Sequence, residues 1–278
     1  MVRQVNSVTI TDRRAAPPAA GLRGRRGTVR LTGVSKVFGR GSSAVRALDK
    51  VSLEVPPGEF TCLIGASGCG KSTLLSLVAG LEQPTSGEVS ANAGGRGGGR
   101  GVAFMFQEPA LFPWLTAAGN VELALRARGL GKAERRQRTG ELLDTVHLTG
   151  FGGKRPHQLS GGMRQRVALA RALAQDADVL LMDEPFGALD AMTRDVLHDE
   201  LDRICAGRQL TILFVTHNVR EAVRLGDRVV VLSSRPGRVI AEYDVPIQRP
   251  RRIDSAPVAE LAARVTDRLR EEMGRDAS

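Results

Sequence analysis

The chain of 278 residues is 42% hydrophobic, so it can bury a sizeable core in one large domain or two small ones. No uninterrupted apolar stretch approaches the roughly 20 residues of a membrane-spanning helix, and residues 1–30 hold no apolar segment of signal-peptide type. The formal charge of +10 does not by itself indicate a nucleic-acid binder, because most of the excess lies in residues 1–30. The chain is therefore expected to be cytoplasmic, and any role at a membrane must come through a partner.

The excess of positive charge marks an N-terminal tail. Seven arginines and a single aspartate fall within residues 1–30, in a segment rich in proline, alanine and glycine. Such a composition favours disorder, so residues 1–28 are predicted to form a disordered basic tail. Two interpretations stay open: the tail contacts anionic lipid or nucleic acid, or it is a solvated and dispensable extension.

The ordered sequence is predicted to begin near Val29 with short β-rich pieces broken by glycine. Their expected bounds are 29–32, 35–38, 44–48 and 51–55. A buried strand is expected at 61–64 and a helix at 71–81, which stops before Pro84. A strand, a glycine-rich loop and a helix in this order begin an α/β unit.

The glycine-rich loop, GASGCGKST at residues 65–73, fits the phosphate-binding pattern G-x-x-x-x-G-K-[ST]. Glycines let the backbone wrap a phosphate chain with its N–H groups pointing inward, and the following helix adds its positive N-terminal end. We expect Lys71 to reach the β- and γ-phosphates and the Ser72 hydroxyl to bind Mg²⁺. The expected phosphate-binding residues are Gly65, Ser67, Gly68, Cys69, Gly70, Lys71, Ser72 and Thr73.

Three cysteines, Cys62, Cys69 and Cys205, lack metal-ligand spacing, so free thiols in a reducing compartment are expected. Two interpretations of Cys69 stay open. A thiolate near helix amides would have a lowered pKa and could act as a redox switch, or a small residue simply fits at this position.

The rest of the chain alternates between strand and helix patterns. Residues 91–101 predict an exposed hairpin or loop, and the pattern is helical from 108 to about 170, which predicts an inserted subdomain. Further strands are expected at 101–106, 179–182, 210–215, 229–232 and 239–243, with helices at 134–146, 164–173 and 192–204. One face of a C-terminal helix is marked by Val258, Leu261, Ala262, Val265 and Leu269. This alternation predicts a mainly parallel, three-layer α/β core.

Residues 179–184, VLLMDE, predict the second half of a phosphate site. Four apolar residues form a buried strand, and Asp183 emerges at its carboxyl end, where open α/β sheets hold ligands. We expect Asp183 to orient Mg²⁺ or its water, and Glu184 to act as the general base for the water that attacks the γ-phosphate. Such a sequence is usually just a strand end, and its pairing with the phosphate loop makes it specific.

The segment LSGGMRQR at residues 159–166 resembles the L-S-G-G-x signature of ABC ATPases. Ser160 and the Gly161 and Gly162 amides lie at a helix start and predict a second anion cradle. The resemblance implies that this cradle covers the γ-phosphate held by a second copy, so that two ATPs lie between two head-to-tail chains. A kinase or GTPase would also have a phosphate loop, but this segment and His217 argue against both.

Further positions resemble the family one by one. Gln107 resembles the glutamine that contacts Mg²⁺ or water and links the site to the helical block. Asp190, in the segment ALD at 188–190, resembles the loop that crosses the dimer interface. His217 resembles the switch histidine that holds the γ-phosphate and the attacking water, and Phe38 stands where an aromatic residue stacks on adenine. The alternatives are a structural histidine and ordinary core packing.

The resemblance covers about residues 29–250, the expected ATPase domain. It implies an α/β fold with a P-loop NTPase three-layer core, an antiparallel β subdomain and an inserted α-helical subdomain at about 108–170. A C-terminal helical extension is expected at 251–278. ATP and Mg²⁺ are the implied ligands, with catalysis by Glu184, His217 and Gln107, and with the metal held by Ser72, Gln107 and Asp183.

A single cassette without a membrane span suggests a separate permease, which would place this chain peripherally at the cytoplasmic face of the membrane. The Pro113-Trp114 pair and the segments FGALDAMTR at 186–194 and SRPGR at 234–238 resemble bacterial importers for nitrate, sulfonate, taurine or bicarbonate. That resemblance implies a small anion as cargo and, indirectly, a substrate-binding protein. Residues 109–114 either form a groove for a permease helix or pack within the helical subdomain.

The alternative class is a soluble ABC ATPase that acts on ribosomes or nucleic acid, with the basic tail as its anchor. Such proteins usually carry two cassettes or a cassette split by a long coiled coil. This chain has one cassette and no sustained heptads, so nucleic acid is not the expected partner.

Overall fold

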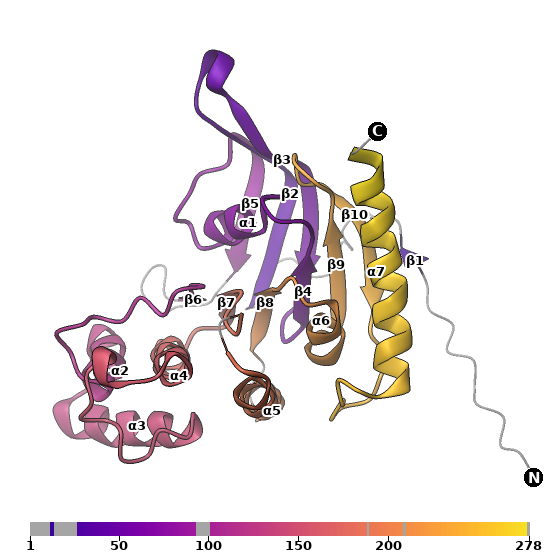
Figure 1. Ribbon diagram of the computed structural model, residues 1–278. Helices are drawn as coiled ribbons and strands as arrows, with labels where there is room; N and C mark the ends of the chain where they lie inside the picture. The colour runs from indigo at the N-terminus through magenta and orange to yellow at the C-terminus, as the bar shows by residue number, and fades with distance from the viewer. Residues whose placement is uncertain (1–11, 14–26, 93–100, 188, 208–209, 277–278) are drawn as a thin grey trace, which may run out of the picture.

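The computed structural model describes residues 12–13, 27–92, 101–187, 189–207 and 210–276, and Figure 1 shows the chain. Within these ranges the strands are β1 (Asp12–Arg13), β2 (Thr28–Phe38), β3 (Val45–Val55), β4 (Phe60–Ile64), β5 (Ser86–Asn92), β6 (Val102–Met105), β7 (Val179–Asp183), β8 (Thr211–Val215), β9 (Arg228–Leu232) and β10 (Val239–Asp244). The helices are α1 (Lys71–Val78), α2 (Ala117–Ala127), α3 (Lys132–Thr145), α4 (Gly161–Leu173), α5 (Ala191–Gly207), α6 (Val219–Leu225) and α7 (Ala256–Asp276), with 3₁₀ turns at Gly41–Ser43 and Pro156–Gln158.

The larger sheet has the order β1-β10-β9-β4-β8-β7-β6. Strands β9, β4, β8, β7 and β6 are parallel, whereas β10 runs antiparallel to β9, and β1 pairs with β10. Every residue of β4, β7 and β8 is buried, as expected for parallel strands covered on both faces. The predicted three-layer, mainly parallel core is confirmed, and the carboxyl ends of these three strands meet at one edge of the sheet.

The smaller sheet, β3-β2-β5, is antiparallel, as the family resemblance implied. Here the structure corrects two predicted boundaries, because the pieces at 29–32 and 35–38 form the single strand β2, and those at 44–48 and 51–55 form β3. Gly33 and Lys50, which interrupt the sequence pattern, both adopt positive φ next to shifts in the register of the pair. A bulge of this kind bends a strand without ending it.

Helix α1 ends three residues earlier than predicted, at Val78. Gly80 adopts a φ of +71°, and its N–H donates to Leu77 O at 3.1 Å. The N–H of Leu81 donates to Ser76 O at 2.9 Å. These two bonds around a left-handed glycine form a Schellman motif, so Gly80 rather than Pro84 ends the helix.

Two hydrophobic cores lie on either side of the larger sheet. One joins the antiparallel sheet and α1 to one face, with Leu31, Leu63 and Leu75 among its buried members. The other core packs the helices α2, α3, α4, α5, α6 and α7 on the opposite face. It includes Phe186 and Phe214, whose ring centroids lie 5.9 Å apart. Each face of the site-bearing sheet is thus covered by its own set of elements.

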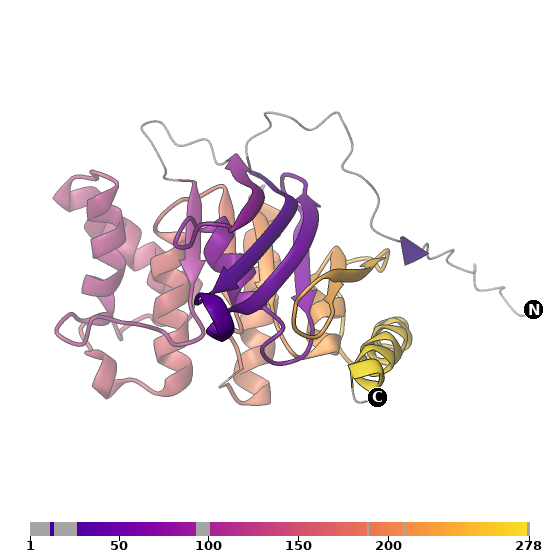
Figure 2. The same ribbon diagram turned by 90° about the horizontal axis from the view of Figure 1, so that it is seen from above.

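Helices α2, α3 and α4 gather at one end of the molecule, and α7 lies at the opposite end (Figures 1 and 2). The predicted helices at 134–146 and 164–173 correspond to α3 and α4, and α2 lies within the block predicted to be helical from 108 to about 170, for which no separate bounds were given. Its start is capped by Thr116, whose hydroxyl accepts a hydrogen bond from Gly119 N–H at 3.0 Å.

Helix α7 packs on α6, and its predicted apolar face is confirmed. Val258, Leu261, Ala262 and Val265 are buried against the core that holds α6, and Leu269 is partly buried. No helix in the described ranges has the length and apolar character needed to cross a membrane.

The N-terminal tail falls largely outside the structure's described residues. Asp12–Arg13 pairs with β10, and the described chain resumes at Gly27 and enters β2 at Thr28. The expectations for the remainder of residues 1–28 and for most of the loop at 91–101 therefore stay predictions.

Candidate nucleotide-binding site

The phosphate loop joins β4 to α1, and glycine determines its shape. Gly68 and Gly70 adopt φ angles of +75° and +98°, which are strained for any residue with a side chain. A Cβ atom on Gly70 would lie 2.7 Å from Leu48 Cδ2 and 2.9 Å from Ala47 O. Strand β3 of the antiparallel sheet therefore packs directly against the loop, at a distance that only glycine permits.

Lys71, the first residue of α1, is only 7% exposed. Its ammonium group donates to the carbonyl oxygens of Gly65 and Ala66, at 2.9 and 3.0 Å. Both partners are neutral, and no carboxylate in the described ranges forms an ion pair with this ammonium group, so a positive charge is held inside the loop. Together with the N-terminal end of α1, this charge makes the loop suited to a polyphosphate.

Asp183 ends β7 and is buried, and its carboxylate forms a hydrogen bond with Ser72 in the first turn of α1. Burial raises the pKa of Asp183 above its usual range, and the hydrogen bond with Ser72 opposes this shift. Carboxylate and hydroxyl oxygens are the ligands that Mg²⁺ prefers. In the described parts of the chain, no cluster of three or more His, Cys, Asp and Glu side chains could hold a metal. The pair therefore fits an ion shared with phosphate oxygens, which is the usual arrangement of Mg²⁺ with nucleotides.

Glu184 and His217 are brought together from the ends of two neighbouring strands, β7 and β8. His217 Nδ1 lies 3.1 Å from Glu184 Oε2, and the two side chains are 67% and 23% exposed. The φ of Glu184 is +42°, and its N–H donates to Val215 O at 3.0 Å. This unusual backbone conformation turns the carboxylate toward the histidine at an open edge of the sheet, where a water molecule can reach both.

Gln107 follows β6, and its side chain is exposed. The backbone carbonyl oxygen of Gln107 accepts a hydrogen bond from Nε2 of Gln165, a buried residue of α4, at 2.8 Å. Gln165 was not among the predicted site residues, although its place within the signature segment was an available signal. The bond joins the Gln107 segment to the helix that begins at the signature.

Ser160 caps the start of α4, where its hydroxyl accepts from Met163 N–H at 3.2 Å. Ser160 and Gly161 are exposed, and a Cβ on Gly162 would lie 3.1 Å from Thr193 Cγ2 at the start of α5. Among the described residues, no hydrogen bond joins this cradle to the phosphate loop, and α4 lies in the helical group away from α1 (Figure 1). The structure thus keeps the two predicted anion cradles apart within one chain.

Asp190 lies just before α5, close to the signature cradle. Its carboxylate accepts from Thr193 N–H at 2.9 Å, and hydrogen bonds with Thr193 lower the pKa of Asp190. The residue is exposed, so it presents a negative charge at the surface, and its partner Thr193 packs close to Gly162. Ala188 of the same predicted segment lies outside the described residues.

Phe38 ends β2 and is 40% exposed, with the Lys36 ammonium 4.8 Å from the centre of its ring. It does not pack in the core. Stacking on adenine stays a prediction for this residue.

Arg235 lies at the site and was not among the predicted site residues. Its Nε donates to Gly68 O over 3.4 Å, and Nη2 would lie 3.2 Å from a Cβ on Gly68. The segment at 234–238 contributed only to the family resemblance, although its arginine next to Pro236 and Gly237 was the available signal. The structure adds an exposed positive charge beside the phosphate loop.

The redox interpretation of Cys69 is not supported. Its side chain is 1% exposed, and burial raises the pKa of the thiol, an effect that the neighbouring Lys71 only partly opposes. Of the two interpretations left open, the one that requires a lowered pKa is contradicted, because burial outweighs the nearby positive groups. A small side chain that fits against the loop is the interpretation consistent with this geometry.

All three thiols should be unreactive in the folded protein. Burial raises the pKa of Cys62 well above its usual range and that of Cys205 to about 12, so little thiolate forms near neutral pH. We expect iodoacetamide to label none of the three cysteines under native conditions and all three in urea, as counted by intact mass. Rapid native labelling of Cys69 would contradict the burial argument.

Comparison with known proteins agrees with this geometry. A family model described as ABC transporter matches residues 48–187. The aliphatic sulfonates import ATP-binding protein SsuB 1 of Mesorhizobium japonicum is 46% identical over 252 residues, which cover 91% of this chain and 92% of that protein. The nitrate import ATP-binding protein NrtD of a Synechocystis species is 46% identical and covers 77% of this chain and 81% of its own length.

A solved dimeric ATP-binding cassette, in a post-hydrolysis state with ADP and phosphate, superposes with a TM-score of 0.71 at 35% identity. The match covers 79% of this chain and all of that cassette. The chain therefore belongs to the ABC transporter family, and the resemblance that the motifs indicated is confirmed.

Proposed function

We propose that this protein is the ATP-hydrolysing subunit of an ABC importer that energises the uptake of a small anion through a separate permease. The observation that carries the proposal is the edge of the parallel sheet, where Lys71, Asp183, Glu184 and His217 converge from three separate segments. The relatives named for sulfonate and nitrate import, matched over most of both chains, support the importer class.

In this proposal the phosphate loop binds ATP through its backbone amides and through Lys71, whose ammonium exchanges two neutral carbonyls for phosphate oxygens. Ser72 and Asp183 hold Mg²⁺ with the help of Gln107, and the ion neutralises charge on the phosphates when it is bound. Glu184 accepts a proton from the attacking water, and His217 orients that water and the γ-phosphate.

The signature cradle acts on a second copy. Ser160 and Gly161 are exposed and Gly162 is half-buried behind them, apart from the phosphate loop of their own chain, so the cradle is free to cover ATP that a partner holds. Asp190 is bonded to Thr193, which packs close to Gly162, and it would cross the same interface. The solved cassette of the same family is dimeric, which supports a head-to-tail pair with two equal sites.

The permease is proposed to dock beside the helical subdomain, which would hold this chain at the cytoplasmic face of the membrane. Trp114 is 68% exposed, and its ring lies 5.4 Å from that of Phe112. An exposed tryptophan next to a half-buried phenylalanine, so soon after Gln107, suits a groove for a permease helix better than packing of both rings within the subdomain. A substrate-binding protein would deliver the anion to the permease.

The alternative, action on ribosomes or nucleic acid, gains no support from the relatives described above, since both are named for import.

The decisive experiment is to purify the protein from its native membranes in mild detergent and identify its partners by mass spectrometry. A multi-span permease, whose complex hydrolyses ATP faster in liposomes with sulfonate, taurine, nitrate or bicarbonate, would support the proposal. Recovery of ribosomes or nucleic acid without a membrane protein would overturn the transport function. Absence of ATP hydrolysis would overturn the whole proposal.

Replacing Asp183 with asparagine should raise the thermal stability of the protein and lower its rate of ATP hydrolysis. Asparagine keeps a partner for Ser72 but carries no charge, so the nucleotide-free variant should have a higher Tm than the wild type at neutral pH. Hydrolysis in the presence of Mg²⁺ should fall at least about 100-fold.

The pH dependence of this Tm difference follows from the raised pKa of Asp183. The cost of burying its charge is present above the folded-state pKa and is lost as the pH falls through it, because the carboxyl group is then neutral. The difference in Tm should therefore shrink in acid. A variant that melts below the wild type at neutral pH would contradict this account.

A further inference from the structure

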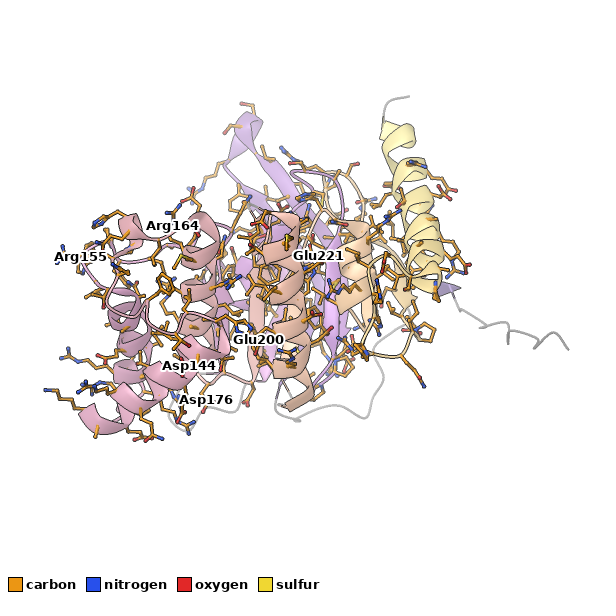
Figure 3. The ribbon with its side chains drawn as sticks, turned by 60° about the horizontal axis from the view of Figure 1, so that its bottom comes forward. Asp144, Arg155, Arg164, Asp176, Glu200 and Glu221 are labelled. Atoms are coloured by element: carbon orange, nitrogen blue, oxygen red, sulfur yellow. The ribbon has the colours of Figure 1, made fainter. Side chains whose placement is uncertain are left out.

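A buried polar network connects α5 and α6 behind the candidate site, and none of its members was among the predicted site residues. Glu221 on α6 lies next to α5, as Figure 3 shows. His198 on α5 is completely buried, and its Nε2 lies 2.7 Å from Glu221 Oε1. The Thr216 hydroxyl donates to the second carboxylate oxygen, Oε2. Arg224 completes the network, with Nη1 at 3.0 Å from His198 Nδ1.

The donors of this network determine which ring nitrogen of His198 carries the proton. A guanidinium group can only donate, so Nδ1 of His198 must accept from Arg224 and carries no proton. The ring proton is therefore on Nε2 and is donated to Glu221. Arg224 also donates to Asp195 and Asp199 on α5, at 2.7 and 2.6 Å. His198 is thus a neutral link between a buried cation and a buried anion.

One end of the network holds the backbone on both sides of His217. Thr216 donates to Glu221, and its hydroxyl oxygen accepts from Asn218 N–H at 3.0 Å. Thr216 N–H donates to Leu63 O at 3.3 Å, which ties it to the strand that enters the phosphate loop. The His217 ring itself is 67% exposed and contacts Glu184, so its position depends on this contact and on the anchored residues on either side of it.

The other end of the network reaches the segment that carries Glu184 and Asp190. The His198 ring packs edge-on against Phe186, with centroids 5.4 Å apart, and Phe186 lies two residues after Glu184. His198 is also in α5, whose first turn is capped by Asp190. A small cavity is lined by residues of both the site and the network, among them Glu184 and Glu221.

We propose that His198 is a positioning residue. It couples the position of His217 at the γ-phosphate to the position of the Asp190 segment at the dimer interface. The inference rests on the proposed function, since it assumes that His217 acts in hydrolysis and that Asp190 faces a second copy. When α5 shifts on contact with that copy, His198 and Glu221 transmit the movement to Thr216. They can do so because each hydrogen bond of the network is directional and shielded from water. ATP hydrolysis is thereby linked to closure of the dimer.

The test compares two substitutions in the full-length protein. In His198→Gln the side-chain amide can donate to Glu221 and its carbonyl can accept from Arg224, so both bonds are kept. In His198→Leu both are lost. We expect kcat for ATP hydrolysis to fall about 30-fold in His198→Leu while KM and the Kd for ATP stay within about twofold, and kcat in His198→Gln to stay within about threefold of the wild type.

Two milder substitutions, both of Thr216, test the proposal if His198→Leu fails to fold. Thr216→Val removes only the hydroxyl and should lower kcat by about tenfold, whereas Thr216→Ser keeps it and should not. The kcat of the double variant His198→Gln with Thr216→Val should equal that of Thr216→Val alone, since the same hydrogen-bond network is already interrupted.

The outcomes separate this inference from the proposed function. A wild-type protein without ATP hydrolysis would remove the proposed function itself. With an active wild type, unchanged kcat in both His198→Leu and Thr216→Val would overturn the positioning role. An equal loss of kcat in His198→Gln and His198→Leu would also overturn it, as would a loss that appears only in the affinity for ATP.

Discussion

Glu184→Gln is expected to bind ATP with unchanged affinity and to hydrolyse it about a thousand times more slowly than the wild type. Glutamine has the same shape but cannot accept a proton from the attacking water. Its side chain can still bond to His217, which lies 3.1 Å from the carboxylate, so the site geometry should be kept. The unhydrolysed ATP should then hold two copies together. Steady-state hydrolysis and the elution volume with and without ATP measure both effects.

Glu260→Gln is a matched control for this experiment. Glu260 is an exposed acid on α7, away from the edge of the sheet that carries the site, and its substitution makes the same change of charge. We expect this variant to hydrolyse ATP at the wild-type rate and to show no ATP-trapped dimer. Normal turnover in Glu184→Gln would remove Glu184 from the role of general base.

Ser160→Arg should leave ATP binding by the single chain intact and abolish ATP-dependent dimerisation together with hydrolysis. The phosphate loop is formed entirely within one chain, and Ser160 has no hydrogen bond to it among the described residues. A large cation at the cradle would fill the space that a partner's γ-phosphate has to enter. Equilibrium binding of labelled ATP and light scattering with ATP in the Glu184→Gln background measure the two effects separately.

The control for bulk is Ser160→Ala, which also removes the cap of α4. Loss of the bond from Met163 N–H should cost about 1 kcal/mol of helix stability without placing any obstacle in the interface. Dimerisation should therefore be weakened only slightly in Ser160→Ala and be lost in Ser160→Arg. If Ser160→Arg still dimerised with ATP, the composite site would be wrong.

Most of the site residues could be predicted from the sequence because their chemistry lies in short continuous segments. The loop at 65–73 places its own amides, lysine and hydroxyl around one point, so its spacing alone predicts a phosphate site. Asp183 and Ser160 are similar cases, since a strand end and a helix start are local features. The predicted fold class follows from the same regularity of strands and helices.

Other features could not be predicted, because they depend on which segments become neighbours and on how deeply each group is buried. The short bonds of Glu184 to His217 and of Glu221 to His198 join residues 33 and 23 positions apart, and no local pattern records either pairing. The early end of α1 was in principle visible at Gly80, but the distant Pro84 was the stronger sequence signal.

The sequence by itself therefore determined the family, the core of the phosphate site and the layered α/β fold, since each depends on local chemistry or on periodic hydrophobicity. Only the tertiary structure decided the state of Cys69, where burial raises the pKa although the local sequence suggests the opposite. It also decided the partners of His198, whose ring is fixed by an arginine and a glutamate from another helix. Desolvation and contact across the sheet are collective results of packing, so they have no counterpart in any short stretch of sequence.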